Sequence, residues 1–309
     1  MLPLDPQVQK LLEQRAVLNE PPLNTLTPAQ ARANAEARPS ATGPEVANVE
    51  NRTIPGPASE IPVRIYTPPG PGPFPTLVYF HGGGWVVGTL DMTDGTCRNL
   101  CVGGECVVIS VDYRLAPEAK FPGPADDCYA VTEWVSRNAS TIGAKPERIA
   151  VGGGSAGANL AAAVCLMTRD RGGPALAFQL LVYPVTDRNF ETASYRENAE
   201  GYMLTRDSMI WYWDQYLNSP SEASDPYAAP AQALDLNGLP PALVLTAEFD
   251  PLRDEGEAYA HRLEAAGVPT TCIRYDGMVH GFFGMHDSVD KAREAVTQAS
   301  AALRDALAS

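Results

Sequence analysis

A glycine-rich corner at residues 151–157 constrains the fold of this chain more than any other stretch. The residues just before it, 148–151, predict a short strand, and residues 156–170 predict an alanine-rich helix. Between them, the pattern Gly153-x-Ser155-x-Gly157 leaves no side chain two positions away on either side of the serine, so a strand and a helix can pack closely beneath it. We therefore expect the serine hydroxyl to stand at the edge of a sheet.

The same corner carries groups suited to catalysis. Ser155 is a candidate nucleophile, and the start of the next helix leaves backbone N–H groups free beside it, with a positive partial charge that suits an oxyanion. A G-x-S-x-G pattern also arises by chance in glycine-rich turns, where the serine is only a turn residue. The rest of the chain has to decide between these interpretations.

The composition restricts the functions open to the chain. Its 309 residues are 45% hydrophobic, which suits one large α/β domain. A net charge of −14 disfavours binding to nucleic acid or to an anionic membrane. No charged and apolar leader opens the sequence, and no apolar run reaches the roughly 18 residues of a membrane span. We expect a soluble, cytoplasmic protein with no membrane span.

Six cysteines are scattered along the chain without the paired C-x-x-C spacing of a zinc site. Cys97, Cys101 and Cys106 are close enough in sequence to gather around a metal, but no second ligand cluster accompanies them. Buried free thiols are the favoured interpretation, and we expect neither a metal nor another cofactor.

Strand and helix signals alternate along most of the chain, which predicts an α/β fold with a mostly parallel sheet of eight strands. The predicted strands cover residues 46–54, 61–67, 76–80, 106–111, 148–151, 178–183, 242–246 and 271–275, and the predicted helices 94–102, 124–137, 156–170, 205–217, 255–266 and 289–307. Two short helices precede the first strand, and strand signals disappear between residues 187 and 230. We expect residues 1–45 and 187–230 to form a helical cap on a catalytic domain that spans 46–309.

Two polar loops follow buried strands. In the turn at residues 81–85, three glycines between His81 and Trp85 let the backbone approach a ligand and point N–H groups at it, which provides a second source of oxyanion donors. In the segment 112–118, Asp112, Arg114 and Glu118 are better explained as a hydrogen-bonded network that holds adjacent loops than as catalytic groups.

Serine hydrolysis needs a base within hydrogen-bond reach of the serine and an acid that orients the base. Ser155, Asp250 and His280 each follow a separate predicted strand, and this chain order is that of α/β-hydrolases. His280 is favoured over the other three histidines because it lies on a strand-end loop beside a glycine. Asp254 is the alternative acid, but it begins a helix and is typical of a cap.

At this point the chain resembles the bacterial hormone-sensitive-lipase-like esterases of the α/β-hydrolase superfamily. The resemblance runs from about residue 45 to the end, and it rests on the motifs at 81–85, 112–118, 153–157, 250–254 and 280–282. It implies Ser155 as nucleophile, His280 as base and Asp250 as orienting acid, with an oxyanion hole made by the backbone N–H groups of Gly82, Gly83 and Ala156. One position departs from the family, because Gly154 stands where Asp or Thr usually precedes the nucleophile.

We therefore expect a carboxylesterase that acts on short- to medium-chain acyl esters through an acyl-enzyme. A related amide hydrolase such as an arylformamidase would use the same triad, and a non-catalytic binding protein is disfavoured because all three triad members are present. A homodimer is compatible with the sequence, which does not determine the oligomeric state. Four aromatic side chains are predicted to contact the substrate: Trp85, Trp211, Trp213 and Phe282.

Overall fold

One eight-stranded sheet forms the centre of the computed structural model, which describes residues 3–308. Its strands are β1 (Asn48–Pro55), β2 (Glu60–Thr67), β3 (Phe74–Phe80), β4 (Val107–Val111), β5 (Ala144–Gly154), β6 (Phe178–Val182), β7 (Ala242–Phe249) and β8 (Thr270–Val279). The order across the sheet is β1-β2-β4-β3-β5-β6-β7-β8. Strand β2 runs antiparallel to both neighbours and the remaining pairs are parallel. The predicted fold class is confirmed, and the carboxyl ends of β3 to β8 meet at one edge.

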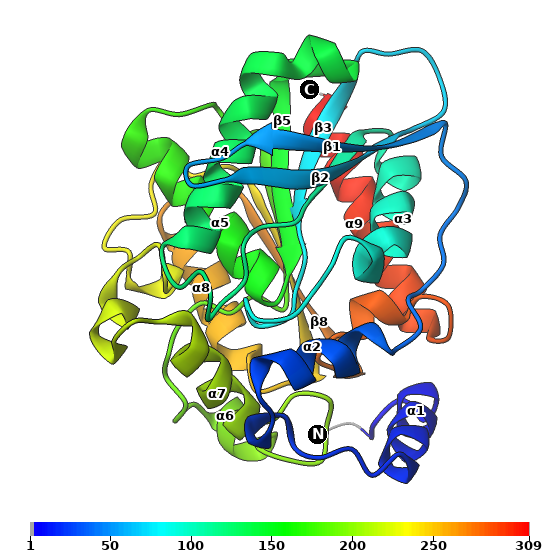
Figure 1. Ribbon diagram of the computed structural model, residues 1–309, viewed down its shortest axis with the longest axis vertical. Coiled ribbons are helices and arrows are strands. Elements are labelled where there is room, and N and C mark those ends of the chain that lie inside the picture. The colour runs from blue at the N-terminus through cyan, green and yellow to red at the C-terminus, as the bar shows by residue number, and fades with distance from the viewer. Residues whose placement is uncertain (1–2, 309) are drawn as a thin grey trace.

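Helices cover both faces of this sheet (Figure 1). One face carries α3 (Asp94–Gly104) and α9 (Asp290–Ala308), and the other carries α4 (Gly123–Asn138), α5 (Ala156–Arg171) and α8 (Arg253–Ala265). Short 3₁₀ turns connect the larger elements at Leu23–Thr25, Asp91–Thr93, Ala139–Ile142, Pro220–Ser224, Pro230–Gln232 and Phe282–Met285.

The central strand β3 shows how the core is divided. Leu77 and Tyr79 belong to the apolar cluster beneath α3 and α9, whereas Val78 and Phe80 belong to the cluster beneath α4 and α5. Because a strand alternates its side chains between the two faces, both faces of β3 are buried. Its sequence is therefore apolar throughout, as expected for a strand covered on both sides.

Four further helices gather at the carboxyl edge of the parallel strands, at the lower end of Figure 1. They are α1 (Pro6–Val17), α2 (Pro28–Glu36), α6 (Ala193–Glu197) and α7 (Arg206–Tyr216). Thr27 begins α2 with a capping box, and Thr205 caps α7 by accepting from the Ser208 N–H. Only a few side chains of α1 and α2 are buried, among them Val8 and Ala31, so these two helices lie over the rest of the chain.

Several strands extend beyond their predicted ends. β5 continues through the glycines to Gly154, and β8 continues through Asp276 and Gly277 to Val279. Glycine and aspartate are poor strand formers, so local propensity ended these strands too early, whereas pairing with the neighbouring strands carries them further. Both extensions bring the backbone up to the residues at the sheet edge.

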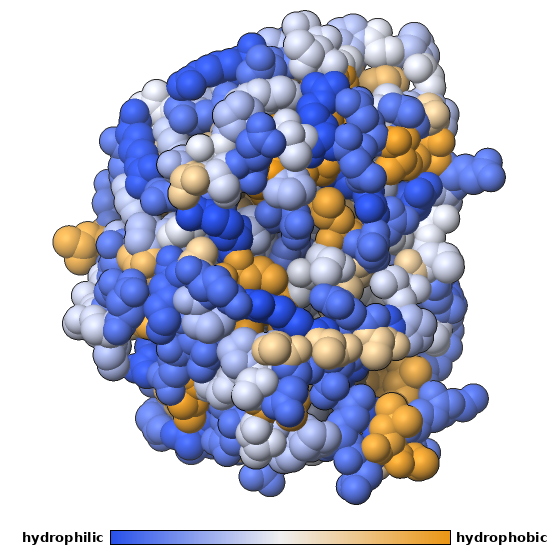
Figure 2. Space-filling model, viewed as in Figure 1, coloured by the Kyte–Doolittle hydropathy of each residue, from blue (hydrophilic) through white to orange (hydrophobic). Residues whose placement is uncertain are grey.

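The outer surface is largely polar. Figure 2 shows that hydrophilic side chains cover most of one face, with apolar side chains in small separate groups. This agrees with the net charge of −14. Within residues 3–308, none of the helices is both long and apolar enough to cross a membrane.

Candidate active site

Ser155 occupies a sharp corner between β5 and α5. Its backbone has φ 58° and ψ −120°, a conformation that non-glycine residues rarely adopt. The glycines on either side are required for space: a Cβ at Gly157 would lie 2.0 Å from the Phe80 carbonyl oxygen, and one at Gly153 would lie 2.5 Å from the Gly157 carbonyl carbon. The predicted corner thus has a steric basis, since the chain can turn here only with glycine at both positions.

The structure brings the three predicted catalytic side chains into one hydrogen-bonded row. His280 Nε2 lies 3.0 Å from Ser155 Oγ, and His280 Nδ1 lies 2.7 Å from Asp250 Oδ2. Because an ionised carboxylate only accepts hydrogen bonds, Nδ1–H donates to Asp250, and Nε2 of the neutral ring is then free to accept the serine proton. The carboxylate is fully buried, and its other oxygen accepts from the Leu252 N–H at 2.9 Å.

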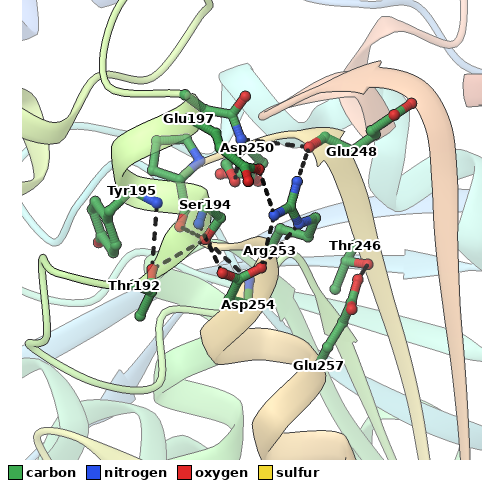
Figure 3. A network of polar contacts seen from close by, with 12 residues as sticks. Thr192, Ser194, Tyr195, Glu197, Thr246, Glu248, Asp250, Arg253, Asp254 and Glu257 are labelled. Atoms are coloured by element: carbon green, nitrogen blue, oxygen red, sulfur yellow. Dashed lines mark hydrogen bonds and ion pairs between the residues drawn. The ribbon is translucent and has the colours of Figure 1, made fainter. Parts of the chain in front are cut away.

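Asp254, the alternative acid, has a different set of partners (Figure 3). It lies in the first turn of α8, accepts from the Ser194 N–H at 2.7 Å, and pairs with Arg253 at 3.0 Å. Leu252 occupies the N-cap position of α8, so the expectation that Asp254 caps this helix is wrong. Asp254 instead holds the start of α6, and this contact fixes part of the 187–230 region beside the loop that carries Asp250.

The loop that carries Asp250 is held by polar contacts around Arg253 and Glu248. Arg253 Nη1 donates to the Glu248 carbonyl at 3.1 Å, and its Nη2 pairs with Glu197 at 2.9 Å (Figure 3). The Glu248 carboxylate accepts from the Gly277 N–H at 2.8 Å, which ties the end of β7 to β8. These contacts fix the ends of β7 and β8, and the two loops that follow carry Asp250 and His280.

A turn of three glycines faces Ser155 from the end of β3. Gly82 and Gly83 line the same cavity as Ser155, and Gly83 has φ +116°, a conformation that favours glycine. The Gly83 carbonyl accepts from the Val86 and Val87 N–H groups, which closes the turn. Within the described part of the chain, the N–H groups of Gly82, Gly83 and Ala156 have no backbone acceptor. They are therefore free to donate to an oxygen that enters the cavity.

The other histidines have structural surroundings. His81 is fully buried, and its ring stacks on Tyr113 with centroids 4.3 Å apart. Burial lowers the pKa of His81 to about 4, so the ring is neutral at physiological pH. His286 is buried against the Thr42 carbonyl at 3.0 Å, and His261 is exposed beside Glu264.

The segment 112–118 forms the expected network of loop contacts. The Arg114 guanidinium donates two hydrogen bonds to the buried Asp127 carboxylate, at 2.7 and 2.8 Å. Glu118 pairs with Arg32 of α2 at 2.5 Å. Asp112 lies directly after β4, and its backbone N–H donates to the Pro62 carbonyl at 3.0 Å. The bonds of Arg114 and Glu118 connect the segment to α4 and to the N-terminal helices.

A cavity of about 620 Å³ opens in front of Ser155 and His280. Its size is typical of small-molecule sites. Helix α7 and its N-cap residue contribute a stripe at helical spacing to the wall, consisting of Thr205, Ser208, Met209 and Tyr212. Further apolar lining comes from the N-terminal segment and from the glycine turn, with Leu23, Leu26 and Val87.

The four predicted substrate-contacting aromatics are not part of this wall, which corrects that prediction. Trp85 is fully buried, stacks on Tyr216 at 4.2 Å, and donates from its indole to Asn159 at 3.3 Å. Trp213 packs beside Trp85 at 4.8 Å, and Trp211 packs on the same core. Phe282 is also fully buried and packs on neighbouring tyrosine rings.

The reason for this error is geometric. Successive residues of a helix point about 100° apart, so Trp211, Tyr212 and Trp213 cannot all face one cavity. Tyr212 is the one that lines it, together with residues three and four positions earlier. The sequence carries the helical spacing of Thr205, Ser208, Met209 and Tyr212, whereas the size of an aromatic side chain does not indicate which face of a helix lines a cavity.

Comparison with known proteins agrees with this geometry. Residues 77–284 match a family model described as alpha/beta hydrolase fold. The chain belongs to this family. It is 46% identical over 265 residues to a carboxylic ester hydrolase, LipN, of Mycobacterium tuberculosis, covering 83% of this chain and 69% of that protein. It is 43% identical over 284 residues to the carboxylesterase NlhH of the same species, covering 89% of each chain. The resemblance to hormone-sensitive-lipase-like esterases is confirmed.

Solved structures show the same likeness. An ester hydrolase from the metagenome of Lake Arreo, in complex with a bipyridine phosphonate derivative, superposes with a TM-score of 0.94 at 43% identity, covering 99% of this chain and 100% of that one. A thermostable esterase from Pseudomonas putida superposes with a TM-score of 0.94 at 40% identity, covering 99% and 98% of the two chains. Almost the whole chain, including its N-terminal helices, is thus shared with these enzymes.

Proposed function

We propose that this protein is a serine carboxylesterase that hydrolyses short- to medium-chain acyl esters, with Ser155 as nucleophile, His280 as general base and Asp250 as the orienting acid. The hydrogen-bonded row from Asp250 through His280 to Ser155, opening onto a cavity beside unpaired backbone donors, carries the proposal. The kinship with proteins named esterases supports ester hydrolysis over other reactions.

Each group has a role in the reaction. Ser155 Oγ attacks the ester carbonyl carbon while His280 Nε2 takes the serine proton, and the buried Asp250 carboxylate stabilises the imidazolium that forms. The negative oxygen of the tetrahedral intermediate accepts hydrogen bonds from the N–H groups of Gly82, Gly83 and Ala156. His280 then gives its proton to the leaving alcohol, and water repeats the sequence on the acyl-enzyme.

Labelling with a fluorophosphonate probe tests the nucleophile. Mass spectrometry should place the adduct on Ser155, and Ser155→Ala should lower kcat by roughly 10⁴-fold without loss of fold. Ser136→Ala is the matched control, because this hydroxyl donates to a carbonyl on α4. Label on another residue, or an active Ser155→Ala variant, contradicts the assignment.

A pair of isosteric variants tests the acid. Asp250→Asn should reduce kcat by orders of magnitude because a neutral amide lacks the negative charge that stabilises the imidazolium. Asp254→Asn should reduce it far less, because Asp254 contacts α6 and Arg253 instead of the histidine. The reverse ranking refutes the assignment.

A comparison of matched ester and anilide substrates, run on the same enzyme, separates esterase from amidase activity.

We also propose that residues 1–45 and 187–230 form the cap that closes the acyl pocket. Both segments line the cavity, the first with Arg15, Leu23 and Leu26 and the second with Met209 and Tyr212, which supports a cap made of these two segments. Removal of residues 1–38 should lower activity on short esters while the sheet still folds. Unchanged kinetics in a well-folded truncation would contradict it.

A cytoplasmic location and a homodimeric assembly stay predictions. Fractionation of the native cells tests the first, and light scattering on the purified protein tests the second.

A further inference from the structure

One wall of the cavity carries charged side chains that hydrolysis of a neutral ester does not need. Arg15, at the end of α1, and Arg38, just after α2, both line the cavity together with Glu20. Arg38 pairs with Glu20 at 2.8 Å, and Arg15 lies 3.6 Å from the same carboxylate oxygen. Two guanidinium groups thus share one carboxylate, so the described residues that line this wall carry more positive than negative charge.

Arg15 is the less satisfied of the two cations. Among residues 3–308, the hydrogen bond of its side chain runs to the thioether sulfur of Met203, at 3.3 Å, and sulfur is a weak acceptor. The side chain is only 35% exposed. Burial, together with the neighbouring Arg38, lowers the pKa of Arg15. A half-buried guanidinium with a poor acceptor is costly, and an anionic oxygen in the cavity would relieve that cost.

Tyr212 connects this wall to the catalytic side of the cavity. Its ring lies against the glycine turn, where a Cβ on Gly84 would fall 2.1 Å from the ring. The same side chain interacts electrostatically with Arg15 and Arg38. The two arginines, Tyr212 and the glycine turn that faces Ser155 thus line the same cavity.

We propose that the cavity accepts esters that carry a carboxylate away from the scissile bond, with Arg15 as its main partner and Arg38 as the second. The planar, two-pronged guanidinium matches a carboxylate. Apolar side chains such as Met209 and Leu26 line the cavity as well, so the substrate has an apolar spacer between its ester and its carboxylate. The carboxylate belongs either to a dicarboxylic half-ester or to an esterified hydroxy acid. The inference rests on the proposed esterase function.

Two series of substrates test the inference. The first compares a 4-nitrophenyl half-ester of a dicarboxylic acid with the neutral 4-nitrophenyl ester of equal length. The second compares an acetylated ω-hydroxy acid with its methyl ester. In at least one series the native enzyme should prefer the anionic substrate, mainly through KM. A preference in the first series places the carboxylate on the acyl side of the ester, and a preference in the second series places it on the alcohol side.

Variants then assign the preference to the arginines. Arg15→Gln should lower kcat/KM for the anionic ester by about 10–100-fold more than for the neutral ester of equal length, as expected for a lost charge-assisted hydrogen bond. Arg15→Lys should fall between, and Arg38→Gln should show a smaller loss. Arg137→Gln, a substitution of an exposed arginine on α4, is the matched control. Binding of the anionic ester to Ser155→Ala, measured by calorimetry, gives a readout that does not depend on turnover.

The outcomes separate two failures. If the neutral ester is hydrolysed and neither anionic ester is preferred, the carboxylate inference is wrong and the proposed function stands. If Arg15→Gln lowers both members of a pair equally, the arginine has only a structural role and the inference is again overturned. If neither neutral nor anionic esters react, the proposed function itself fails.

Discussion

Arg32 of α2 is expected to hold the glycine turn at residues 81–85 in place from outside the sheet. Its Nε donates to the Val86 carbonyl at 2.8 Å, its Nη2 donates to the Ala116 carbonyl at 2.9 Å, and the guanidinium pairs with Glu118 at 2.5 Å. Val86 is one of the two residues whose N–H groups close the glycine turn by donating to the Gly83 carbonyl. Replacement of Arg32 by Met should therefore loosen both the turn and the attachment of α2.

The expected loss of stability follows from the hydrogen-bond partners of Arg32. A hydrogen bond that involves a charged group contributes about 1.5–3 kcal/mol, and Arg32 makes two of them to carbonyl oxygens. The Arg32 side chain is 25% exposed, so water replaces part of what is lost, and we expect Arg32→Met to lower the free energy of unfolding by about 2–4 kcal/mol. Glu118 is 65% exposed, so Glu118→Gln should cost only about 0–1 kcal/mol.

Urea unfolding of the two variants measures this contrast. Arg32→Met should also lower kcat more than it changes KM, because a displaced turn weakens hydrogen bonds to the transition state more than ground-state binding. Equal losses of stability in Arg32→Met and Glu118→Gln would show that the surface ion pair, and not the carbonyl bonds, attaches α2. Unchanged kcat in Arg32→Met would show that the turn holds its shape without this residue.

Three further predictions concern the corner and the thiols. Gly157→Ala should destabilise the fold by about 3 kcal/mol or more in urea unfolding, because its Cβ would meet the Phe80 carbonyl oxygen at 2.0 Å, and a stability equal to that of the native protein would refute this. Gly154→Ala should change the free energy of unfolding by less than about 1 kcal/mol, because two effects oppose each other. Alanine stiffens the unfolded chain and is allowed here, since Gly154 lies outside the left-handed region, but its Cβ would lie 3.2 Å from the Tyr183 ring. A large loss of stability would mean that glycine is required. Burial raises the pKa of Cys272 to about 11, so its reaction with a disulfide reagent should be slow at pH 8 and accelerate by about tenfold per pH unit, and a rate that is flat with pH would contradict this.

The three side chains that we propose as catalytic were predictable as a cluster because each lies just after a strand of a parallel sheet. Ser155, Asp250 and His280 are far apart in sequence, but the carboxyl ends of β5, β7 and β8 meet at one edge, so chain order and strand position were enough to assemble them. Asp254 was harder to place. Its place at the start of a predicted helix suggested a cap, yet its partner, Ser194, lies 60 positions earlier in a segment that has no strand pattern.

Specificity was less predictable than catalysis for a physical reason. Glycine patterns and strand ends are local signals, because the backbone geometry that they impose is set within a few residues. The cavity wall instead depends on how α1 and α2 lie against α7, and Arg15 meets Met203 across 188 residues of sequence. No periodicity within either segment indicates that contact.

This difference leads to an expectation about where substitutions act. The proposed triad and the glycine turn are held by the sheet and by close backbone packing, so substitutions there should lower kcat for every ester. The cap residues Arg15, Met209 and Tyr212 line the cavity, and within residues 3–308 none of them forms a hydrogen bond with Ser155, His280 or Asp250. Substitutions there should therefore alter KM and the ranking of substrates. A cap substitution that lowered kcat equally for every ester would indicate that the cap also positions the catalytic groups, as we propose for Arg32 and not for Arg15.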